Sequence, residues 1–143
     1  MKTVIFTKNL LAIILLSFLF QSCHLKAVEM YPPSFTVDQI KLQDSIKEKT
    51  NCESVKFTTL KVKDSEQMIL DTQLQIDIIN PKNFPITRED LKKTTKPLVV
   101  QARNALKNSS EYSSFKINII TEKVNGSNSY SKTVPIEFKA EEL

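Results

Sequence analysis

Alternation of apolar and polar residues in four segments limits the fold of this chain more than any other feature of its sequence. A period of two residues places successive side chains on opposite faces of a β-strand. The alternation predicts strands over Val55–Lys63 and Gln67–Ile79, and two more around Phe115–Ile119 and Val134–Phe138. Each of these strands has an apolar face that must be buried against another layer.

The first two predicted strands are separated by Asp64-Ser65, which are typical turn residues. A two-residue loop here predicts a register in which apolar residues share one face: Val55 with Leu74, Phe57 with Thr72, and Thr59 with Leu70. The loop Asn80–Pro85, which has two prolines and two asparagines, ends the second strand.

The connection between the last two strands contains the only glycine of the chain, Gly126. A type I′ turn at Asn125-Gly126 would place Ile119 opposite a lysine, Lys132. A type II′ turn at Gly126-Ser127 instead gives three apolar pairs and is favoured: Ile119 with Val134, Ile117 with Ile136, and Phe115 with Phe138. Pro135 has no backbone N–H, so we expect the last strand at an edge of the sheet.

Two helices are predicted between these hairpins and before them. Thr36–Thr50 has Thr36 as a candidate N-cap and a shared face of Val37, Ile40 and Ile46, although Phe35 and Val37 also fit a short strand. Thr87–Asn108 begins with Thr87 as a cap. Its apolar stripe consists of Leu91, Leu98, Ala102 and Ala105, with Val99 and Leu106 beside it.

Pro97 lies inside this second helix. A proline there removes one backbone hydrogen bond and clashes with the preceding turn. We therefore expect a break or kink near Thr94–Pro97.

The predicted order is helix, hairpin, helix, hairpin, which defines an α+β domain over residues 35–143. The economical arrangement is a four-stranded antiparallel sheet with the helices on one face. Residues 23–34 have no hydrophobic period and contain Pro32-Pro33, which predicts a stiffened tether before the domain.

The segment before that tether has the pattern of a secretory signal peptide. Lys2 and Lys8 precede eleven residues without charge, Leu10–Phe20. As a helix this run would span about 16 Å, which is short against a hydrocarbon core of about 30 Å. The alternatives are an uncleaved membrane anchor and a buried core helix.

The run Phe20-Gln21-Ser22-Cys23 resembles the lipobox of bacterial lipoproteins, in which a small residue directly precedes an acylated cysteine. Phe20 occupies a position where leucine is usual. The resemblance implies that residues 1–22 are removed and that Cys23 carries a diacylglycerol thioether and fatty acid. The protein would then be anchored to a membrane of the bacterial cell envelope, facing the periplasm or the cell surface. The alternative is an ordinary secreted protein cut elsewhere, for example after Ala27.

The sequence shows no catalytic, metal or cofactor site. The single histidine, His24, adjoins the predicted anchor, so a lone Cys52 is expected to be a small buried residue and not a nucleophile. Asp71 and Asp77 lie about 20 Å apart along one strand at 3.3 Å per residue, too far to share a metal ion. A net charge of +4, with acids and bases interleaved, argues against nucleic-acid binding.

The remaining candidate is a basic cluster on the second helix. Lys92, Lys93 and Lys96 lie close together, with Arg88 and Arg103 nearby. Such a cluster fits a solvated helix face, or the binding of an acidic partner or of anionic lipid headgroups. The expected function is a non-enzymatic binding or accessory module with a protein partner in the envelope. The alternative is an inhibitor or immunity protein against an envelope hydrolase, with Asn80–Pro85 as its contact loop.

Overall fold

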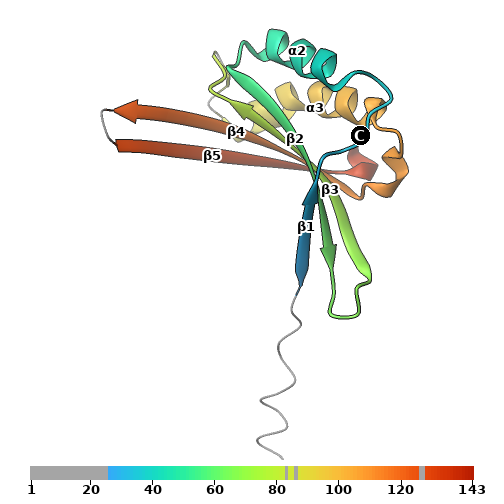
Figure 1. Cartoon of the computed structure of the whole chain (residues 1–143). Helices are drawn as coiled ribbons and strands as arrows, with labels where there is room; N and C mark the ends of the chain where they lie inside the picture. Colours follow the sequence, from blue (N-terminus) through green and yellow to red (C-terminus); the bar gives the residue numbers. More distant parts are fainter. Residues whose placement is uncertain (1–25, 83, 86, 126–127) are drawn as a thin grey trace, which may run out of the picture.

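A computed structural model of the chain describes residues 26–82, 84–85, 87–125 and 128–143. It confirms the α+β class and the two predicted hairpins, and it shows a sheet of five strands in the order β1-β2-β3-β4-β5 (Figure 1). The strands are β1 (Ala27–Tyr31), β2 (Ser54–Lys63), β3 (Ile69–Ile79), β4 (Ser114–Asn125) and β5 (Asn128–Lys139). The helices are α2 (Gln39–Thr50) and α3 (Arg88–Ala105), with short 3₁₀ turns η1 (Ser109–Glu111) and η2 (Ala140–Glu142).

The sheet is mixed, so the expected four-stranded antiparallel sheet is wrong. Within each hairpin the strands are antiparallel, but β3 and β4 pair in parallel, from Gln73 with Ser114 to Ile79 with Ile120. Helix α3 connects these two strands. A helical crossover returns the chain to the end of the sheet where the previous strand began, and the next strand therefore runs parallel to it.

The fifth strand, β1, begins within the stretch predicted as a tether. It pairs antiparallel with β2, from Ala27 with Lys63 to Tyr31 with Thr59. Val28 and Met30 do alternate with their neighbours in the sequence. Because this strand has only five residues and is followed by two prolines, the alternation is a weak signal. The sheet thus extends the folded part of the chain to Ala27, ahead of the predicted start at residue 35.

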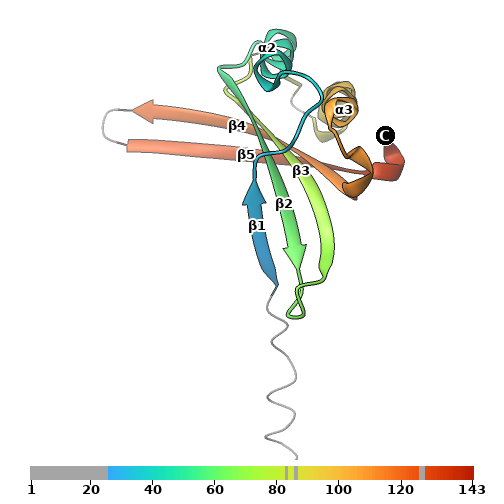
Figure 2. The same cartoon turned by 45° about the vertical axis from the view of Figure 1, so that its right-hand side comes forward.

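Both helices cover the same face of the sheet, and the core lies between the two layers (Figure 2). The strands contribute alternate residues, and α3 contributes the predicted stripe, which is confirmed. Fully buried side chains at the centre include Leu74, Ile76, Ile78, Val99, Phe115, Ile117, Ile136 and Phe138.

Helix α3 continues through Pro97, so the expected break is wrong. Pro97 lies on the exposed side of the helix, where water can bind the carbonyl that has lost its partner. Buried residues on both sides, Leu91 and Thr95 before it and Leu98 after it, pack both halves of the helix into the core. The predicted cap is confirmed, because Thr87 Oγ1 accepts a hydrogen bond from the Asp90 N–H at 3.2 Å.

Helix α2 begins later than predicted. Its N-cap is Asp38, whose carboxylate accepts from the Ile40 N–H at 2.8 Å, while the hydroxyl of Thr36 donates to the Ala105 carbonyl. Phe35 forms a bridge to Leu106, close to the short-strand alternative. Of the predicted apolar face, Ile46 is buried as expected, but Val37 and Ile40 are exposed and Leu42 packs into the core in their place.

The predicted register is confirmed in one hairpin and wrong in the other. In the β4–β5 hairpin the favoured register is confirmed, including the central pair Ile117 with Ile136, and the turn at 126–127 lies outside the described residues. Strand β5, with Pro135, lies at an edge as expected. In the β2–β3 hairpin the prediction is wrong by four residues: Val55 pairs with Ile78, Phe57 with Ile76, and Thr59 with Leu74.

Candidate basic site on helix α3

A surface hollow of about 500 Å³ lies between the N-terminal half of α3 and the C-terminal end of the chain. Most of its lining side chains are charged, and we call it the basic hollow. Its lining residues are Arg88, Glu89, Lys92, Lys93, Lys96, Phe138 and Glu142. The structure thus brings together four of the five basic residues that the sequence singled out.

The helical repeat explains this clustering. Arg88, Lys92 and Lys96 follow each other at intervals of four residues, so they share one side of α3. Phe138 reaches the hollow from the core face of β5, and the Lys92 Nζ lies 5.4 Å from the centre of its ring. An ammonium group at this distance is attracted to the face of an aromatic ring. The hollow therefore combines cations with an apolar floor.

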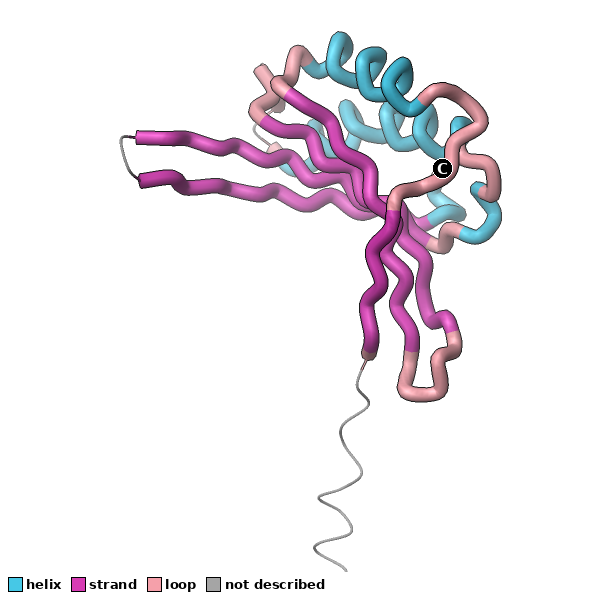
Figure 3. The backbone as a smooth tube through the Cα atoms, viewed as in Figure 1, coloured by secondary structure: helices cyan, strands magenta, loops and turns pink. Residues whose placement is uncertain are grey.

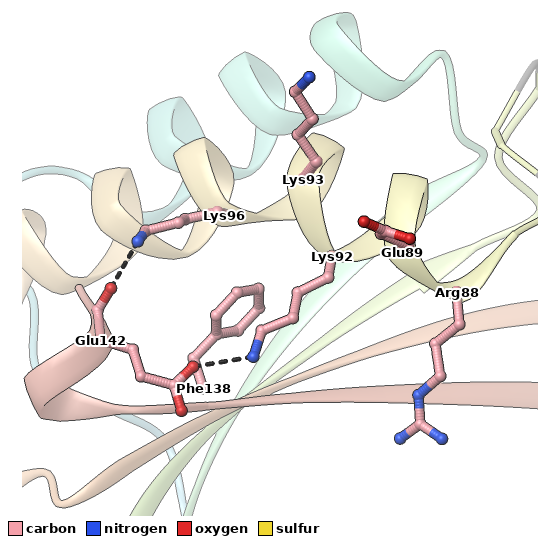
Figure 4. A pocket seen from close by; sticks show the side chains of 7 residues that line it. All are labelled: Arg88, Glu89, Lys92, Lys93, Lys96, Phe138 and Glu142. Carbon is pink, nitrogen blue, oxygen red and sulfur yellow. Dashed lines mark hydrogen bonds and ion pairs between the residues drawn. The ribbon is translucent and has the colours of Figure 1, made fainter.

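The C-terminal residues occupy one end of the hollow, as Figure 4 shows. Lys92 Nζ lies 2.9 Å from the Glu142 carboxylate, and Lys96 Nζ donates to the Glu142 carbonyl at 2.5 Å. Arg103, the fifth basic residue, donates to the Ala140 carbonyl at 3.2 Å. These contacts fix the end of the chain: residues 140–142 form the turn η2, and Leu143 packs against the core.

The hydrogen bond from Lys92 lowers the pKa of the Glu142 carboxyl. A carboxyl whose pKa is lower in the folded chain stabilises the fold above its unfolded pKa and loses that effect as the pH falls through the folded value. We expect Glu142→Gln to lower the Tm at neutral pH, and the difference from wild type to shrink as the pH falls below about 4.3, the ordinary glutamate pKa. Thermal unfolding followed by circular dichroism across pH measures this. Glu141→Gln is the matched control, and an equal shift in both variants would contradict the prediction.

Arg88 and Lys93 differ from the two lysines that hold the tail. Within the residues that the structure describes, neither makes an ion pair. In Figure 4 Lys93 points away from Phe138, and Arg88 extends past the other end of the hollow. Both side chains are thus placed to contact a second molecule.

The other candidate residues from the sequence are separated in the structure. Cys52 is buried as expected, and its Sγ donates to the Ser54 carbonyl at 3.4 Å. Asp77 accepts from Asn118 at 2.7 Å, whereas Asp71 accepts from Ser113, so each carboxylate has its own partner. In the described ranges no three metal-ligating side chains gather into a possible metal site. Cys23 and His24 lie outside these ranges.

Tyr112 is a core residue, although it lies just before the start of β4. Its ring stacks against Phe115 with centroids 6.1 Å apart, and its hydroxyl lies 2.9 Å from Thr59 Oγ1. Burial raises the pKa of the Tyr112 hydroxyl. This residue belongs to the scaffold that supports β4 under α3.

Comparison of the chain with protein-family models, with curated proteins and with solved structures finds no match. Among the helices of the described residues, none has both the length and the hydropathy to cross a membrane.

Proposed function

We propose that the protein is a lipid-anchored, non-enzymatic binding module of the bacterial cell envelope. The observation that carries this proposal is the sequence Ser22-Cys23 directly after the apolar run Leu10–Phe20 and its N-terminal lysines. An acylated Cys23 would provide two or three acyl chains, which is enough for stable attachment. The protein would then act at the cell envelope, on the side that faces the periplasm or the cell surface.

The binding site that we propose is the basic hollow, and its ligand is an acidic segment of a partner protein. One lysine of the hollow, Lys92, already holds a carboxylate of the chain itself, that of Glu142. Arg88 and Lys93 extend the positive charge beyond this internal contact, and the buried ring of Phe138 closes the hollow from below. Lysine and arginine side chains bind carboxylates through charge-assisted hydrogen bonds, which supports an acidic segment as the ligand.

The test is capture of the partner from envelope extracts on the full-length acylated protein. We expect the double variant Arg88→Glu/Lys93→Glu to bind the captured protein about tenfold more weakly, because two attractive charges become repulsive ones. The matched control is Lys123→Glu/Lys132→Glu, which makes the same charge change on the β4–β5 hairpin and should bind as wild type does. Equal binding by all three proteins would show that the hollow is not the partner site.

The same capture distinguishes the inhibitor or immunity alternative. A stoichiometric hydrolase that loses its activity in the complex would identify an inhibitor. A partner without hydrolase activity supports the binding module.

A further inference from the structure

One end of the sheet carries a group of exposed apolar side chains, which we call the apolar end. They come from β1 and from the tip of the β2–β3 hairpin, and each is more than half exposed: Val28, Met30, Met68, Ile69 and Leu70. On the face away from the helices, Val28 pairs with Val62 and Met30 with Leu60, which continues the apolar surface onto β2. Exposed apolar groups concentrated in this way indicate an interaction surface.

The apolar end is also the end at which the folded part of the chain begins. Ala27, the first residue of β1, pairs with Lys63, and Lys63 pairs with Ile69 at the hairpin tip. Figure 3 shows the start of β1 and the β2–β3 loop at the same end of the molecule, away from both helices. Whatever holds the chain just before Ala27 therefore also lies near the tip.

The length of chain before β1 limits the distance to the anchor. Cys23 lies four positions before Ala27, and four residues span at most about 14 Å when fully extended. If Cys23 is acylated, the apolar end cannot stand far from the bilayer surface. This step rests on the proposed function.

The hairpin tip is built to present its apolar residues without exposing unpaired backbone groups. The Asp64 carboxylate accepts from the backbone N–H groups of Glu66 and Met68, each at 2.9 Å. Asp64 N–H donates to the Met68 carbonyl at 3.0 Å. Because the turn satisfies these backbone groups itself, Met68 and the residues after it can leave water without leaving these N–H and C=O groups unpaired.

The charged residues at the hairpin tip are mostly acidic, which disfavours electrostatic attraction to anionic lipids and leaves an apolar contact. Lys63 is paired with Glu29 at 2.7 Å, and Asp64 and Glu66 lie in the turn. Anionic headgroups therefore gain little attraction here. Methionine, isoleucine and leucine side chains gain free energy by entering the boundary between headgroups and acyl chains.

We propose that the apolar end is seated in the surface of the bilayer that carries the Cys23 anchor, with Met68, Ile69 and Leu70 entering the interfacial region. This contact fixes the orientation of the domain. Helices α2 and α3 lie toward the opposite end of the molecule, so the basic hollow faces away from the membrane and is open to a partner (Figure 1).

The experiment uses the full-length acylated protein in vesicles of phosphatidylethanolamine and phosphatidylglycerol. An environment-sensitive fluorophore is attached at Ile69→Cys or, as the matched control, at Tyr130→Cys, both with Cys52→Ser so that the label has one site. The two positions have nearly equal exposure, 55% and 57%, but Tyr130 lies on the β4–β5 hairpin, which projects away from the tip (Figures 1 and 2). Circular dichroism confirms that each labelled variant is folded.

We expect the label at position 69 to shift to shorter wavelength and to be quenched several-fold more by nitroxide-bearing lipids than the label at position 130. Raising the salt concentration should leave this difference unchanged, because the contact is apolar. Equal quenching at both positions would overturn the proposal. A shift to shorter wavelength without quenching by lipid would also overturn it, because the tip would then be covered by protein, such as a second copy of the chain.

Flotation of the vesicles and the mass of the Cys23 peptide separate this inference from the proposed function. Protein that is acylated and floats but has an unquenched tip contradicts only the orientation. Protein that is neither acylated nor floats contradicts the anchor itself, and the orientation with it.

Discussion

Serine in place of Cys23 is expected to abolish fatty-acid labelling of the protein and to leave the full 143-residue precursor uncut. The thioether forms at a thiol, and a serine hydroxyl at neutral pH is a far weaker nucleophile than a cysteine thiol, which is a few per cent ionised. In the proposed lipoprotein the acylated Cys23 becomes the new N-terminus, so loss of the lipid is expected to block cleavage as well. Metabolic labelling with palmitate and the mass of the purified protein measure both effects.

Cys52→Ser is the control for this variant. Cys52 is the only other cysteine and it is buried, so its replacement should leave labelling and cleavage unchanged. If the Cys23→Ser protein is instead cut normally and released, the lipobox interpretation is wrong. The chain would then be an ordinary secreted protein.

The β4–β5 hairpin shows where sequence alone is sufficient. The two competing turns differ by two residues in register, which keeps every side chain on its face, but only the type II′ register gives Ile119 an apolar partner as well as Ile117 and Phe115. The apolar stripe of α3 was equally informative, because only one orientation of the helix buries that stripe against the sheet. Both elements depend on contacts that are local or repeated along the chain.

The β2–β3 hairpin shows why other features could not be predicted. A shift of four residues keeps every side chain on its original face, so alternation could not distinguish Val55 opposite Leu74 from Val55 opposite Ile78. The loop decided the outcome, through the carboxylate of Asp64 and the left-handed backbone of Gln67, which has a φ of 64°. The parallel pairing of β3 with β4 likewise depends on the path of α3 between them, which no local pattern specifies.

The basic hollow was predictable in part for the same reasons. Spacing along α3 gave Arg88, Lys92 and Lys96 a common side, but Phe138 and Glu142 are more than forty residues away in the sequence. Phe138 and Glu142 reach the hollow because β5 lies beside β4 and because the turn η2 follows β5. The sequence therefore indicated a charged helix face, and the fold converted it into a hollow with an internal carboxylate.

Phe115→Ala is expected to cost about 3–5 kcal/mol of the free energy of unfolding, the usual cost of removing a buried aromatic side chain. Phe115 is fully buried in β4, pairs with Phe138 across the hairpin and stacks on Tyr112, so no neighbour can move in to fill the space without breaking other contacts. Domains of this size have a total stability of about 5–15 kcal/mol, so the variant should be marginally folded.

Urea unfolding of the detergent-solubilised protein measures the effect of this substitution. The chain has no tryptophan, so far-UV circular dichroism is the appropriate signal. Tyr130→Ala is the control, since it truncates an exposed aromatic residue in the adjacent strand and should change stability by no more than about 0.5 kcal/mol. A similar small loss in both variants would contradict the packing of β4 and β5 under α3. A large loss confined to Phe115 would support that packing, on which the floor of the basic hollow depends because Phe138 is the partner of Phe115 in the sheet.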